Sequence, residues 1–177
     1  MKRPPLSVVF VAVLMIAIGE TSGAAMSLLR PRIAQMAERR VAANPAAHGL
    51  AGSAEYDAEV TRVAVYTAEA GLSFLHTHAQ AMGPVVLLVG TLGATLVPWP
   101  RPRRLFFALV GIGGLFPLGY LVYAIAAVEL GRDTGVALAE RYVLAPLGGA
   151  AVAALLILVV ALVSGRAGRA HARRRPA

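Results

Sequence analysis

Hydrophobic residues gather in four long runs along the chain, and more polar segments separate these runs. Each run has about 20 or more residues, enough to cross ~30 Å of hydrocarbon at ~1.5 Å of rise per helical residue. Transmembrane β-strands would need alternating segments of about 10 residues, and none are present in the sequence. The pattern predicts an all-α membrane bundle of four transmembrane helices, a single domain with spans at about 6–29, 71–97, 105–130 and 143–163.

The composition supports a membrane protein and excludes several kinds of site. Apolar residues make up 58% of the 177 residues, charged residues make up 15%, and the mean hydropathy is +0.68. Soluble domains usually have about 45–50% apolar and about 25% charged residues, and disordered chains need low hydrophobicity. The chain has no cysteine, which excludes disulfides, thiolate metal sites and covalently attached c-type haem.

The placement of basic residues predicts the orientation of the bundle. The segments 1–5, 98–104 and 164–177 lie on one side of a four-span protein and carry basic but no acidic residues. The long outer loop 30–70 and the segment 131–142 have as many acidic residues as arginines. Because basic residues accumulate in cytoplasmic loops, we expect both termini in the cytoplasm of a bacterial-type inner (plasma) membrane. The net charge of +8 is then a topology signal. We expect the basic tail to contact anionic lipid and not nucleic acid, since no aromatic residue is interleaved.

The first hydrophobic run has an alternative interpretation as a cleaved signal peptide. Basic residues precede it, and the small residues Ser22, Gly23 and Ala24 form a candidate cleavage site. Cleavage would remove about residues 1–24 and leave three spans. The apolar run resumes after Gly23, and Pro4 and Pro5 suit a helix start, which favours a true transmembrane helix.

The outer loop is too long to be a simple turn. Residues 32–43 can form an amphipathic helix on the membrane surface, and Asn44 followed by Pro45 should end it. Ser53 can cap a second helix, which we expect to continue directly into span two. His48, between the two helices, is expected to be solvated, with an outside ligand as the alternative.

Polar residues within the spans are concentrated in one layer near the outer face. Glu20 lies nine residues before Leu29, which is about 13 Å of helix, and His76 and His78 lie at a similar depth in span two. Gln80 belongs to the same layer. Ionisable groups inside a membrane are costly, so they are candidates for a functional site. We expect Glu20 to be buried, to face span two and to contact one of the two histidines.

The two histidines cannot bind one metal ion together, because two helical residues differ by about 200° in direction. Each should therefore serve its own partner. His76 shares a face with Gln80 and Gly83, and Gly83 leaves room for a flat group or a closely packed helix.

The segment from Leu75 to Gly83 resembles a known arrangement. In the catalytic subunit of haem–copper oxidases, and in small membrane proteins related to it, a transmembrane His-x-His motif carries haem on opposite helix faces. The resemblance implies haem as a cofactor, with His76 and His78 as metal ligands. From their place in the same layer, we expect Glu20 and Gln80 to orient an imidazole or hold a proton. The resemblance also implies a haem-binding or electron-transfer subunit of a respiratory-type complex. The chain has no histidine cluster for copper, so oxygen reduction by this chain alone is not implied.

Three alternatives stay open at this stage. The polar layer could only fix helix packing in a non-enzymatic accessory or assembly subunit. It could also serve a proton or a quinone, or the protein could form an oligomeric pore. In each case the partners are the lipid bilayer and other membrane subunits or further copies of the chain.

Pro117 and Pro146 are expected to kink or start helices. No sequence order typical of a hydrolase is present.

Overall fold

The protein is all-α over the residues that its structure, a computed structural model, describes: 2–172, with side chains as far as 164. Four stretches of helix are long and apolar enough to cross a membrane, which confirms the predicted bundle of four transmembrane helices. The last residues of the predicted basic tail, 173–177, lie outside the described residues. The elements in order are α1 Leu6–Ala43, α2 Pro45–His48, α3 Ala54–Leu96, α4 Pro100–Gly114, α5 Leu118–Glu129, α6 Arg132–Ala139, the π-helical turn η1 Glu140–Leu144, and α7 Ala145–Ala172.

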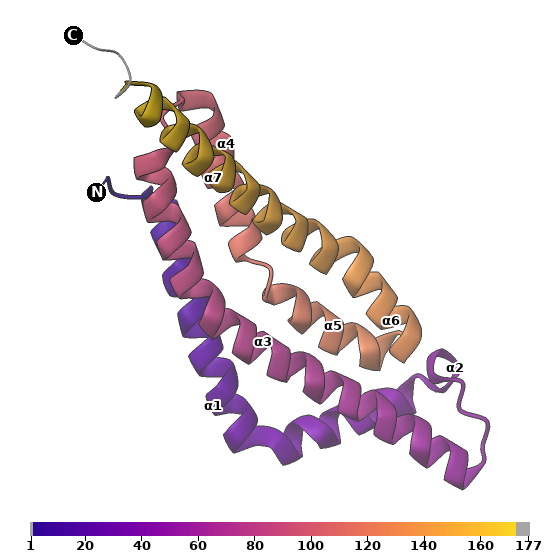
Figure 1. Cartoon of the computed structure of the whole chain (residues 1–177). Coiled ribbons are helices and arrows are strands. Elements are labelled where there is room, and N and C mark those ends of the chain that lie inside the picture. Colours follow the sequence, from indigo (N-terminus) through magenta and orange to yellow (C-terminus); the bar gives the residue numbers. More distant parts are fainter. Residues whose placement is uncertain (1, 173–177) are drawn as a thin grey trace.

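The helices pack as two connected layers. Figure 1 shows α1 beside α3 on one side, with α4, α5 and α7 on the other. Helix α1 starts and α7 ends at the same end of the bundle, where α3 passes into α4, and α2 and α6 lie at the opposite end (Figure 1).

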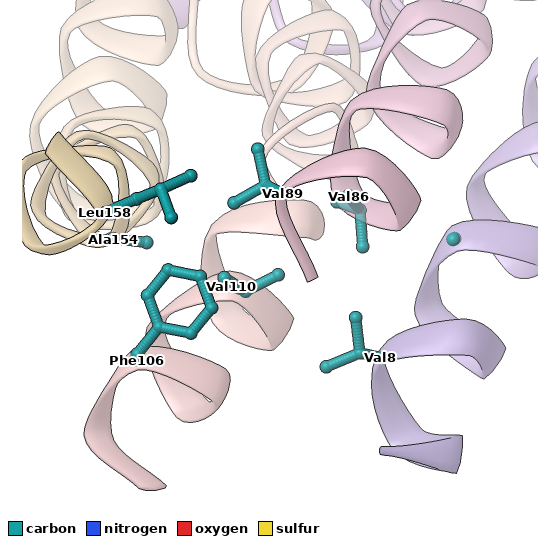
Figure 2. Close-up of a cluster of buried hydrophobic side chains, with 8 residues drawn as sticks. Val8, Val86, Val89, Phe106, Val110, Ala154 and Leu158 are labelled. Carbon is teal, nitrogen blue, oxygen red and sulfur yellow. The ribbon is translucent and has the colours of Figure 1, made fainter. Parts of the chain in front are cut away.

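The largest apolar cluster lies near the end of the bundle that holds the N-terminus. Four helices contribute to it: Val8 and Ala12 of α1, Val86 and Val89 of α3, Phe106 and Val110 of α4, and Ala154 and Leu158 of α7. Figure 2 shows these side chains converging between the helices. Phe106 is 0% exposed and its ring lies against Gly93, where a Cβ atom would collide with the ring. This contact ties α4 to α3.

The outer ends of α1 and α3 extend well beyond the predicted spans. Helix α1 has 38 residues and α3 has 43, so they are about 57 Å and about 64 Å long at ~1.5 Å per residue. The outer helix predicted over 32–43 is a continuation of α1 and ends at Ala43 as expected. It buries Ala37 and Val41 against α3 and α5, where the sequence had suggested a helix on the membrane surface.

Helix α3 runs from the outer segment through span two without interruption, as predicted. Ser53 occupies its N-cap position, but the Ser53 side chain makes no capping hydrogen bond. The carboxylate of Asp57 instead accepts hydrogen bonds from the backbone N–H groups of Ala51 and Gly52, at 2.8 and 2.9 Å. Asp57, in the first turn of α3, therefore fixes the loop that precedes this helix.

Span three is broken in its middle at Pro117, one of the two prolines that were expected to kink or start a helix. Residues 115–117 separate α4 from α5, because Pro117 has no N–H and its ring cannot follow a helical residue without a clash. The neighbouring backbone N–H groups donate to the carbonyl three residues earlier instead of four. An example is the bond from the Phe116 N–H to the Gly113 carbonyl at 3.0 Å. Pro117 is the N-cap residue of α5, and Pro146 lies in the first turn of α7, so both start helices as predicted.

Candidate functional site

The candidate site lies where α1 and α3 cross, and glycine makes the close crossing possible. Added Cβ atoms at Gly19 and Gly23 of α1, and at Gly83 of α3, would collide with the opposite helix. At Gly83 the obstacles include the Ala12 carbonyl oxygen, at 2.8 Å. Small residues allow transmembrane helix backbones to approach in this way. The close approach brings side chains of α3 within hydrogen-bonding distance of the α1 backbone.

The ring of His76 packs against Gly19 and Gly23 of α1. Its Nδ1–H donates a hydrogen bond to the carbonyl oxygen of Gly19 over 2.7 Å. A Cβ atom at Gly23 would lie 2.6 Å from Nδ1 and 3.1 Å from Nε2 of the same ring. The imidazole is therefore held between Gly19 and Gly23, and α1 occupies the space beside it.

Glu20 faces span two as predicted, but the rest of the expectation for this residue is wrong. Its Oε1 accepts a hydrogen bond from Nε2 of Gln80 at 2.9 Å, whereas the ring of His76 bonds to the neighbouring Gly19. Glu20 is also exposed at the surface of the bundle and not buried. The physical reason is the crossing geometry, because the glycines draw His76 to the α1 backbone and leave Glu20 at the edge of the contact.

His78 points away from α1, toward the break between α4 and α5. Its Nδ1–H donates to the Phe74 carbonyl oxygen at 2.9 Å, one turn earlier in the same helix. Its ring centroid lies 4.8 Å from that of Tyr120, 5.9 Å from Phe116 and 6.0 Å from Phe74. The predicted opposite directions of the two histidines therefore correspond to two different environments, one against backbone and one among aromatic rings.

The side chains that meet in the polar layer of Glu20, His76, His78 and Gln80 limit the chemistry that it can perform. Within the described residues, no three histidine, cysteine, aspartate or glutamate side chains come together as a metal site would require. Two polar contacts of the layer, His76 with Gly19 and Gln80 with Glu20, are hydrogen bonds between α1 and α3 and fix their packing. A haem bound to His78 would use Nε2, because Nδ1 is already engaged.

His48 is buried, so the expectation that it is solvated is wrong. Only 8% of its surface is exposed, and its Nε2–H donates to the Val128 carbonyl oxygen of α5 at 2.9 Å. Its Nδ1 atom is buried without a partner among the described residues. The next residue, Gly49, has a φ of 64° and ends α2 in a left-handed conformation, which turns the chain back and places His48 against α5. The flanking alanines and Gly49 are the sequence signal for this short capped helix.

Comparison with known proteins assigns the chain to no family. No protein-family model, curated protein or solved structure matches it. The function is therefore argued from the geometry of the α1–α3 crossing.

Proposed function

We propose that the protein is a non-enzymatic subunit of an inner-membrane assembly and that it binds a transmembrane helix of a partner through the surface around Glu20. The observation that carries this proposal is an ionisable side chain exposed on the bundle at membrane depth. A charged side chain facing lipid at the centre of a membrane costs about 2.5–3.5 kcal/mol on insertion scales. A hydrogen-bonding partner helix would remove this penalty.

The surroundings of Glu20 suit a second helix. We call this surface the Glu20 face; it consists of exposed positions on two adjacent helices, namely Ala17, Glu20, Thr21 and Ala24 of α1 and Thr77 and Ala81 of α3. Every member except Glu20 is small, so another backbone can approach closely. Gln80 supplies Glu20 with one hydrogen bond, and a carboxylate can accept several more. The partner should therefore present a hydrogen-bond donor at this depth.

The orientation that we propose puts the Glu20 face in the outer leaflet. Both ends of the chain would be cytoplasmic, because the unbalanced basic residues lie at the N-terminus, in the α3–α4 turn and in the tail. The bonds of the polar layer would then hold α1 on α3 and keep Glu20 in place for the partner.

Photo-crosslinking in native membranes tests this proposal. A benzoylphenylalanine in place of Ala24 or Thr77 should give an adduct of higher mass that contains a second membrane protein or a second copy of the chain. The matched control replaces Val159 of α7, which is 53% exposed on an apolar helix surface. Adducts at none of the three positions, or equally at all three, would overturn the proposal.

A second candidate function is haem binding at His78 in a redox-associated subunit. It is favoured by the bond from Nδ1 to the Phe74 carbonyl, since metal-bound histidines usually donate their other ring N–H. Haem would supply one-electron transfer, and His78 would hold it among the rings of Phe74, Phe116 and Tyr120. The face of His76 offers less room, because α1 lies against that ring. An absorption spectrum tests this candidate: a Soret band should persist in His76→Ala and vanish in His78→Ala. A purified folded protein without such a band would reject it.

A further inference from the structure

A cavity of about 640 Å³ lies between α1 and α3 at the outer end of their spans. It is bordered on the inner side by the contact of Gly23 with His76. On the outer side, Ala37 and Val41 pack against residues of α3. Helix α1 touches α3 at both places and bows away from it in between.

The bow has a local cause in the α1 sequence. Pro31 lies inside the helix and has no N–H to donate to the carbonyl of Ser27, one turn earlier. The Ser27 hydroxyl also donates to the Gly23 carbonyl at 3.0 Å, a type of bond that bends helices. The bend that opens the cavity therefore follows from two residues of α1 itself, Ser27 and Pro31.

The lining of the cavity combines apolar side chains, a few polar ones and one ion pair. Met26, Leu72 and Phe74 are apolar, Ser27 and Ser73 are polar, and Arg30 and Glu69 form the ion pair. Nη2 of Arg30 lies 3.2 Å from Oε2 of Glu69, with the two side chains 74% and 23% exposed. Arg30 follows the first predicted span directly and Glu69 slightly precedes the second, so this ion pair lies at the level of lipid headgroups.

We infer that this cavity binds the headgroup of a zwitterionic aminophospholipid. The phosphate would contact Arg30, the ammonium would donate to Glu69, and the start of the acyl chains would lie along Met26, Leu72 and Phe74. The charges are complementary: a fixed cation beside a fixed anion matches a phosphate that is linked to an ammonium group.

Other lipid classes satisfy the pair less well. An anionic headgroup without a cation leaves its phosphate beside the Glu69 carboxylate with no compensating bond. A choline headgroup has no N–H to donate to Glu69. The Arg30–Glu69 pair itself adds little to the stability of the bundle, since exposed ion pairs are weak in water. The proposed partner helix occupies a different surface, so the two proposals stand or fall independently.

Native mass spectrometry of the full chain tests the inference. The detergent-solubilised protein is equilibrated with equal amounts of phosphatidylethanolamine, phosphatidylcholine and phosphatidylglycerol, and the retained lipids are counted. We expect phosphatidylethanolamine to exceed each of the others by about tenfold, as a charge-assisted hydrogen bond of about 1.4 kcal/mol would give. Glu69→Gln should abolish the preference over phosphatidylcholine, and Ile33→Trp, which fills the cavity, should reduce retention of all three.

The matched control is Arg62→Gln, which breaks a similar exposed pair with Glu59 on the outer part of α3 and lies outside this cavity. It should retain the wild-type preference. Circular dichroism and size-exclusion profiles establish that each variant is folded. Equal retention of the three lipids by the wild type would overturn the inference, as would an unchanged preference in Glu69→Gln. A quinone that co-purifies in the cavity and is displaced by no phospholipid would also overturn it.

Discussion

His76 donates its Nδ1–H to the backbone carbonyl of Gly19 across the contact between α1 and α3, over 2.7 Å. The same carbonyl oxygen accepts a bond from the Ser22 hydroxyl at 3.0 Å, so the imidazole shares this backbone acceptor with a side chain of α1. The contact requires a glycine at residue 23, because the ring occupies the place of a Cβ atom there. One side chain and two glycines thus set how closely the first two spans approach.

Adding a methyl group at residue 23 should weaken this contact. The Cβ atom of Gly23→Ala would collide with the His76 ring, and we expect a loss of about 1–3 kcal/mol in the free energy of unfolding. Denaturation in detergent, followed by circular dichroism, measures the loss. Gly149→Ala of α7 is the control, since a Cβ atom there meets nothing within 4 Å. It should be neutral or slightly stabilising, and equal effects of the two variants would contradict the assigned role of Gly23.

Replacing each histidine by phenylalanine should separate their structural roles. His76→Phe keeps a ring but removes the donor to α1, and we expect a loss of about 0.6 kcal/mol, the average for bonds between membrane helices, and at most about 1.7 kcal/mol. The bond of His78 stays within α3, so His78→Phe should preserve the packing of the spans. The same denaturation measurement compares them. A larger loss in His78→Phe would show that the aromatic cluster, and not the α1–α3 bond, fixes the bundle.

The sequence predicts the helices, and which residues lie at the same level along them, because both follow from local rules. Hydrophobic run length and helix rise placed Glu20, His76 and Gln80 in one layer, and helix geometry turned His76 and His78 in opposite directions. These relationships need no knowledge of neighbouring helices. The resulting layer is present in the structure as a set of contacts between α1 and α3.

The exact pairing within the layer does not follow from the sequence, because it depends on how two helices cross. Gly19 and Gly23 let α3 come close enough for His76 to reach backbone, so Gln80 and not a histidine meets Glu20. The burial of His48 has the same origin in contacts between distant segments. The bow of α1 and the break before α5 differ, because Pro31 and Pro117 are local signals in the sequence.

Glu20 should matter for the assembly more than for the fold of the single chain. Glu20→Leu removes the acceptor of the Gln80 bond and makes the Glu20 face apolar, whereas Glu20→Gln keeps a hydrogen-bonding group of similar size. We expect Glu20→Leu to shift the native-gel mass of the membrane extract toward the isolated chain, and Glu20→Gln to retain the larger species. A complex of unchanged mass in Glu20→Leu would contradict a contact through this residue.

Reporter fusions should place both ends of the chain in the cytoplasm. A fusion at residue 177 should give a cytoplasmic signal, and one at residue 50, in the outer segment between α2 and α3, should give an external signal. The reason is the excess of basic residues on the side of the termini. An external signal at residue 177 would mean that a span has been miscounted. N-terminal sequencing of the purified protein completes the test, because a chain that begins near Ala25 would have lost its first segment as a signal peptide.

Two glycines with similar positive φ angles should differ in how much they stabilise the outer end of the bundle. Gly52 and Gly131 have φ values of 81° and 83°, so alanine at either position strains the backbone by about 1–3 kcal/mol. Gly131 also lies against the Ala47 carbonyl oxygen, where a Cβ atom would collide, whereas Gly52 has open space around it. Gly131→Ala should therefore push α2 away from α5, break the bond from His48 to the Val128 carbonyl, and raise the hydrogen-exchange rate of residues 45–50. Gly52→Ala should strain the backbone without a collision, and it should leave that exchange rate close to the wild-type value. If both variants accelerate exchange equally, the contact of Gly131 with Ala47 does not hold the outer segment in place.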